Sequence, residues 1–206
     1  MNYWVTFIAG WGLIAATGEC STMPLRVAPT DLDEVRILEE HTINIPVEGC
    51  VTGSFEKANA VLREINLLDR VQTAYAAQLP SGQKPDFVVH STGKGQYFYV
   101  SKDDERCDIR ELWRKTDTNT WFEAAFHVRG GRVCGSFESL VYLTVAREGT
   151  TAPEVLRYSA DVRVWPHQAW ARFLVHYLPG VESYFRLKTT EMRSIMARVF
   201  TTIVST

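Results

Sequence analysis

Three consecutive segments between residues 121 and 164 place apolar side chains on every second position, which is the period of a β-strand. The alternating residues are Phe122, Ala124, Phe126 and Val128; Val133, Phe137, Val141, Leu143 and Val145; and Leu156, Tyr158, Ala160, Val162 and Val164. Each strand therefore has one apolar face and one polar face. Since an apolar sheet face must be covered, the amphipathic C-terminal segment is expected to pack on it as a helix.

The rest of the chain supplies more strands and one more helix. We expect strands at residues 41–47, 87–92, 96–101 and 108–115, with Pro46 marking an edge strand, and an amphipathic helix at 55–79. A C-terminal helical region begins at Pro166, and residues 31–40 fit either a helix or a strand. The prediction is an α+β fold: a curved antiparallel sheet of six to seven strands packed on a long C-terminal helix.

This order of elements resembles the START-like (helix-grip, SRPBCC) superfamily. The resemblance covers about residues 40–203 and includes the point where a strand ends at Trp165-Pro166 and enters the helical tail. It implies an apolar cavity between the sheet and the last helix. Members of the superfamily bind lipids, sterols or polyketides, and some are cyclases.

Aromatic and methionine side chains are the candidates for the wall of such a cavity. Methionine is flexible and polarizable and adapts to varied apolar ligands, although a stripe at helical spacing also suits an ordinary core. The predicted ligand-binding residues are Phe122, Phe126, Phe137, Tyr158, Tyr177, Met192 and Met196.

The first nineteen residues read as an export signal or a membrane anchor. Residues 1–18 contain no charged side chain, and the apolar core ends in small residues. With Cys20, this segment resembles a degenerate bacterial lipoprotein signal, which implies acylation of that cysteine. Because Glu19 precedes the cysteine, a cleaved signal and a retained helix stay open. We expect a tether at 20–39, a single domain at 40–206, attachment to the membrane through the N-terminus, and a place in the bacterial cell envelope.

The sequence holds no motif that predicts chemistry. The net charge is −2, without a basic run, so nucleic acid is not an expected partner. Neither a cofactor nor a metal is expected, since no C-x-x-C pair occurs among the cysteines. The string Gly-Ser-Phe-Glu-Ser at 135–139 lies in an expected strand, and Glu123, His127 and Glu138 fall on the polar parity, where they are expected to face water. No catalytic residue is predicted.

We therefore expect an exported, membrane-attached protein that binds an apolar molecule, such as a lipid, without transforming it. One alternative is a cyclase-like enzyme on the same scaffold, which requires a titratable group in the cavity. The other is an interaction module of the cell envelope with a filled core.

Overall fold

The computed structural model describes residues 27–77, 79–85, 87–101, 106–117, 119–130, 136–149, 153–177 and 181–205. The apolar segment 1–19 and Cys20 lie outside these residues. Within the described ranges, no helix combines the length and the apolar composition that crossing a membrane requires. The elements in chain order are α1 (Leu32–Glu40), β1 (Ile43–Thr52), α2 (Phe55–Leu62), α3 (Leu67–Ala77), β2 (Phe87–Gly93), β3 (Gln96–Ser101), β4 (Arg106–Asp117), β5 (Trp121–Gly130), β6 (Phe137–Glu148), β7 (Val155–Pro166), α4 (Ala169–Tyr177) and α5 (Val181–Ser205).

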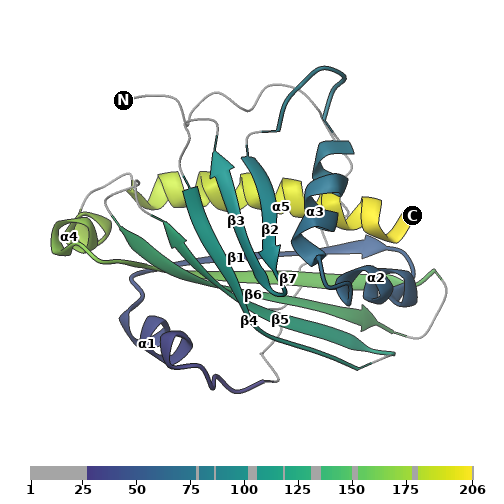
Figure 1. Ribbon diagram of the computed structural model, residues 1–206, viewed down its shortest axis with the longest axis horizontal. Helices are drawn as coiled ribbons and strands as arrows, with labels where there is room; N and C mark the ends of the chain where they lie inside the picture. The colour runs from purple at the N-terminus through teal and green to yellow at the C-terminus, as the bar shows by residue number, and fades with distance from the viewer. Residues whose placement is uncertain are drawn as a thin grey trace.

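Seven strands form one antiparallel sheet in the order β1-β7-β6-β5-β4-β3-β2. β1 pairs along its whole length with β7, so the first strand lies beside the last one. The sheet is curved and not closed, with α5 on one side and α1 on the other (Figure 1). This is the α+β helix-grip architecture that the sequence predicts. Pro46 lies in the edge strand β1, as expected for a residue without a backbone donor.

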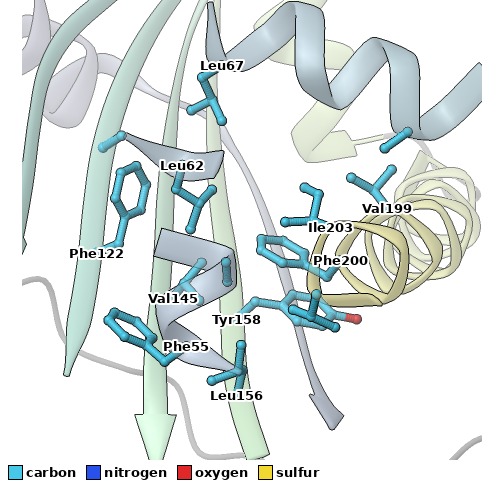
Figure 2. Close-up of a cluster of buried hydrophobic side chains, with 14 of the residues drawn as sticks. Phe55, Leu62, Leu67, Phe122, Val145, Leu156, Tyr158, Val199, Phe200 and Ile203 are labelled. Atoms are coloured by element: carbon cyan, nitrogen blue, oxygen red, sulfur yellow. The ribbon is translucent and has the colours of Figure 1, made fainter. Parts of the chain in front are cut away.

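The inner face of the sheet, defined by Phe122, Phe126 and Tyr158, faces α5. Phe126 and Val162 are 4% and 8% exposed, which confirms the predicted alternation. Figure 2 shows side chains of α5 pointing toward the strands, and the ring of Phe200 stacks on Tyr158 with centroids 4.6 Å apart. Burying a side chain of this size contributes about 1.5–3 kcal/mol relative to exposure.

The outer face, defined by Ala125, Leu140 and Tyr142, is also covered. Ile37 of α1 packs on these three residues, and all four are nearly inaccessible to solvent. The expectation of one polar face is therefore wrong for the centre of the sheet. Because α1 covers them, the central strands β5 and β6 are buried on both sides over much of their length.

The open choice for residues 31–40 is settled by a helix cap. The Asp31 carboxylate accepts hydrogen bonds from the backbone N–H of Asp33 and Glu34, at 2.9 and 3.3 Å. The Glu34 carboxylate in turn accepts from the backbone N–H of Asp31, which completes a capping box. Residues 32–39, assigned to the tether from the sequence, thus belong to a helix that packs on the sheet.

The predicted helix at 55–79 is two helices, α2 and α3. Its expected cap is present, since the Ser54 hydroxyl accepts from the backbone N–H of Lys57. A side chain of the sheet fixes the break between the two helices at residues 63–66. Arg114 donates to the carbonyls of Leu62 and Glu64 at 2.8 and 2.6 Å. These bonds satisfy carbonyls that a helix end leaves without partners, so the chain turns there.

Strand β4 contains a β-bulge at Leu112, where the pairing steps from Glu111 opposite Phe126 to Trp113 opposite Ala125. A regular strand would put Trp113 on the same face as Glu111. The extra residue instead turns Trp113 to the outer face and Arg114 to the inner face, opposite Ala124.

Two element boundaries differ from those predicted from the sequence. Pro166 is the last residue of β7, where it pairs with Phe137, so the helix that was expected to begin there begins at Ala169. β1 runs five residues past Val47, because its pairing with β7 continues to Thr52.

Candidate functional site

The predicted ligand-binding residues lie in different surroundings along the inner face. Phe122, Phe126 and Tyr158 belong to the main buried cluster, and Met196 packs against it while keeping some exposure. Phe137 is half-buried. The helices that carry Tyr177 and Met192 are described, but the side chains of these two residues lie outside the described part of the structure.

Burial is uneven between the sheet and α5. At one end Val145 is 0% exposed and packs in the same cluster as Phe200 and Ile203. Toward the middle of the sheet, Val141 and Leu143 on the same strand remain partly exposed, and so do Ile195 and Met196 on α5. Strand β6, an interior strand of the sheet, therefore keeps accessible apolar surface on the side that faces the helix.

The bulge adds an ion pair to the inner face that sequence reasoning missed. Arg114 donates to both carboxylate oxygens of Glu111, at 2.9 and 2.5 Å. Beside them Tyr97 is buried and donates a 2.9 Å hydrogen bond to the carbonyl of Ile65. Burial raises the pKa of Tyr97, and the negative charge of Glu111 adds to this shift. Because Arg114 also binds two backbone carbonyls, its hydrogen bonds serve the α2–α3 turn.

On the outer face, a buried carboxylate joins α1 to the sheet. Glu34 is 0% exposed, and its Oε1 accepts hydrogen bonds from Trp113 Nε1 at 3.0 Å and from the Tyr142 hydroxyl at 2.9 Å. Its Oε2 accepts from the backbone N–H of Thr30 at 3.1 Å. Burial, the bond to Glu34 and its charge all raise the pKa of Tyr142 far above the ordinary value.

A second polar cluster lies next to Glu34, and its burial shows that one prediction from the sequence is wrong. His127 and Glu138, expected in water, are 3% and 6% exposed, and Glu123 is also buried. His127 Nε2 lies 2.8 Å from Glu138 Oε2, which also accepts a 2.8 Å hydrogen bond from Arg36 of α1. The covering helix is thus the reason that these two polar-parity side chains are enclosed.

The two buried groups have shifted pKa values. Burial lowers the pKa of His127 below its ordinary value, although the hydrogen bond to Glu138 works in the opposite direction. Burial by itself would raise the pKa of Glu138, but the hydrogen bond from His127 and the charge of Arg36 bring it below its ordinary value. At neutral pH the pair is a neutral imidazole donating to a carboxylate.

An open cleft of about 600 Å³ lies where β3, β4 and β5 meet the start of α1. Its lining includes Arg106, Arg110 and Arg129 together with Asp33 and Asp108. Arg110 and Arg129 lie within 4 Å of Asp33, and Arg106 is paired with Asp108. Each of these guanidinium groups therefore already lies within 4 Å of a carboxylate. Among the described residues, no group of three or more His, Cys, Asp or Glu side chains could hold a metal ion.

Comparisons with known proteins add evidence on the fold. No family model and no curated protein matches this chain. A hypothetical protein from Helicobacter pylori, jhp0584, superposes with a TM-score of 0.51 at 11% identity, covering 90% of this chain and 98% of that one. A conserved protein from Geobacillus kaustophilus has a TM-score of 0.47 at 9% identity, covering 79% and 93%. The di-domain ARO/CYC protein BexL of the BE-7585A biosynthetic pathway has a TM-score of 0.38 at 9% identity, covering 83% and 52%.

The likeness to the Helicobacter protein shows a shared fold at low identity. Similarity at this level extends to the arrangement of strands and helices and not to the chemistry of a site. The function must therefore be argued from the residues of this chain.

Proposed function

We propose that this domain holds an apolar molecule, such as a lipid, between the inner face of the sheet and α5, without transforming it. The observation that supports the proposal is the partial exposure of Val141 and Leu143 on the interior strand β6. Leaving apolar surface accessible costs about 25 cal/mol per Å² relative to burying it. An apolar ligand in this place would bury that surface and stabilise the folded state by mass action.

The side chains around these two residues suit a ligand of variable shape. Met196 packs against the main buried cluster and against a second inner-face cluster that includes Ile45 and Val162, and it remains half-buried. A methionine can change rotamer to follow different apolar surfaces. Phe126 lies directly across the ladder from Val141 and supplies a rigid aromatic wall. The proposed ligand would contact these three residues.

The experiment uses the full chain and a fluorescent fatty acid, cis-parinaric acid. We expect stoichiometric binding, and we expect native mass spectrometry of protein gently extracted from its own membrane to show a co-purifying lipid. Val141→Trp should weaken binding at least tenfold, because the indole would occupy the accessible surface. The matched control is Val88→Trp on β2, where the valine is 40% exposed.

Three outcomes would contradict the proposal. They are a bare mass with no probe binding, equal binding by the two tryptophan variants, and chemical conversion of the bound molecule. The first would favour an interaction module with a filled core, and the third would favour an enzyme.

We further propose that residues 1–19 direct export and that Cys20 is acylated, which would place the domain at the membrane of the bacterial cell envelope. The support is the uncharged apolar segment followed by small residues and a cysteine. Membrane fractionation of Cys20→Ala tests the anchor. Release of this variant from the membrane supports acylation, and unchanged retention would contradict acylation and point to an uncleaved helix.

A further inference from the structure

We propose that Ser136 is an activated nucleophile that accepts the acyl group of an ester, with His167 as its general base and Glu138 as the residue that orients the histidine. The proposal is independent of the apolar site between the sheet and α5. It concerns the start of β6 and the end of β7, on the side of the sheet where Glu138 lies under α1.

The three side chains form a continuous chain of contacts. Ser136 Oγ lies 3.1 Å from Nδ1 of His167, and His167 Nε2 lies 3.2 Å from Oε1 of Glu138. The backbone N–H of His167 also donates to the carbonyl of Ser136 at 3.0 Å, so the two residues are joined through their main chains as well as their side chains. A nucleophile within reach of a base, with the base oriented by a third group, is the arrangement of nucleophilic catalysis.

One hydrogen bond and one close approach favour a single tautomer of His167: the Ser136 hydroxyl is bonded to Nδ1, and the Glu138 carboxylate lies 3.2 Å from Nε2. Because a carboxylate only accepts, we assign the proton to Nε2, the nitrogen nearest Glu138, and Nδ1 is then an acceptor for the Ser136 hydroxyl. The ring of Trp165 packs against His167 with centroids 4.6 Å apart, which limits how far the imidazole can turn. The base is therefore oriented to take a proton from the serine.

Glu138 is held in place and ionised. Its second oxygen, Oε2, lies 2.8 Å from both His127 Nε2 and the guanidinium of Arg36. These partners outweigh the effect of burial and lower the pKa of Glu138. The Glu138 carboxylate thus lies beside Nε2 of His167, in the place of the orienting group in a nucleophile–base–acid arrangement.

Ser136, which the sequence placed inside a strand as part of the string at 135–139, has a different structural context. β6 begins at Phe137, so Ser136 precedes the strand and is exposed, and the His167 side chain is 34% exposed. An ester can reach Ser136 from solvent. Because both side chains are open to solvent, the proposed substrates are small or activated esters.

The proposed reaction balances with the ester and water alone. Ser136 Oγ bonds to the carbonyl carbon while its proton passes to His167 Nδ1. The bond from that carbon to the alkoxy oxygen then breaks, and the alcohol leaves with the proton from His167. Water repeats both steps on the acylated serine and releases the carboxylic acid.

The test uses the full chain with p-nitrophenyl acetate and a fluorophosphonate probe, which loses fluoride when a serine oxygen bonds to its phosphorus. We expect one probe per molecule, located on Ser136 by peptide mass spectrometry, and release of p-nitrophenol. Ser136→Ala should abolish both signals, and Ser91→Ala, which alters an exposed serine on β2, should change neither. An unlabelled Ser136 in the wild-type chain would overturn the proposal without reference to any variant.

The roles of the other two residues have separate tests. His167→Ala should slow labelling about 100-fold or more, the usual contribution of a positioned general base. Glu138→Gln should slow it by a similar factor, while Glu138→Asp, which keeps a carboxylate, should restore the rate to within about tenfold of wild type. Equal rates for wild type and His167→Ala, or for the Gln and Asp variants at equal melting temperature, would contradict the assigned roles.

Discussion

The hydroxyl of Tyr142 donates a 2.9 Å hydrogen bond to Oε1 of Glu34, which joins two residues 108 positions apart in the chain. Trp113 donates to the same oxygen, so β4, β6 and α1 meet at one carboxylate that is 0% exposed. A buried carboxylate is tolerated only when donors surround it. The first helix therefore belongs to the folded domain through a polar contact as well as an apolar one.

Replacing Glu34 with Ala should destabilise the protein by about 2 kcal/mol or more, because Trp113 Nε1 and the Tyr142 hydroxyl lose their acceptor inside the fold. The loss should be concentrated at α1. Urea unfolding gives the total loss of stability. In hydrogen exchange, the substitution should accelerate the amides of residues 34–40 more than those of β6, each relative to wild type.

The control for this prediction is Glu39→Ala, because Glu39 is an exposed residue on the same helix. It should change the free energy of unfolding by no more than about 0.5 kcal/mol. If Glu34→Ala were equally mild, the carboxylate would not be what holds α1 on the sheet.

Stability should fall as the solution is acidified below about pH 6.5. The pKa of His127 is lowered from 6.5 in the folded state, chiefly by burial, so the unfolded chain takes up a proton first as pH decreases. Its contribution is complete above that pH and is lost progressively below it. The lowered pKa of Glu138 has the same sign and acts further down, below about 4.5.

Urea unfolding at pH 7.5 and pH 5.5 measures the effect. For one histidine the loss over this range is at most about 1.4 kcal/mol, since pH 5.5 lies one unit below the unfolded pKa. In His127→Gln, whose amide can still donate to Glu138, the decrease should be smaller. Equal pH dependence in both proteins would show that His127 titrates alike in the folded and unfolded chains.

Much of the inner face could be predicted from the sequence, and little of the outer face. The two-residue alternation in β5, β6 and β7 is a local pattern, and it correctly indicates that Phe122, Val145 and Leu156 are buried. The outer face depends on where α1 packs, which is a tertiary relationship. Nothing near His127 in the sequence shows that Ile37 and Arg36 will cover that side of the sheet.

The bulge at Leu112 could not be predicted from the sequence for a related reason. A bulge inserts one residue without changing composition, and it reverses the face of each later residue relative to strict alternation. Trp113 and Arg114 therefore contact partners on the opposite sides from those that parity predicts. The contact between Ser136 and His167 likewise required the pairing of β6 with the end of β7 to be known.

Arg114→Ala should cost about 2–3 kcal/mol, because it removes the donor to the Leu62 and Glu64 carbonyls of the α2–α3 turn and leaves the Glu111 carboxylate without its partner on the inner face. Arg110→Ala is the matched control on the same strand, since Arg110 is 46% exposed and its ion pairs are worth less than about 1 kcal/mol. Chemical denaturation measures both. Equal losses would contradict a structural role for Arg114 at the α2–α3 turn.

The last prediction concerns Gly49, which lies opposite Tyr158 in the β1–β7 ladder. A Cβ at this position would overlap the hydroxyl and ring carbons of Tyr158. That ring is 1% exposed and stacks on Phe200, so it has little room to move away. Gly49→Ala should therefore destabilise the protein by about 1–3 kcal/mol, as overpacking does in a dense core.

Gly93 at the end of β2 is the matched control, because a Cβ there meets nothing within 4 Å. Gly93→Ala should be close to neutral in the same thermal or urea unfolding experiment. The two variants add the same single carbon to a strand, so the difference between them measures the space around Tyr158 and not the strand preference of alanine. If Gly49→Ala were also neutral, the stacked pair of Tyr158 and Phe200 would be able to shift as a unit, and the close approach of Gly49 to Tyr158 would not constrain how α5 packs on the sheet.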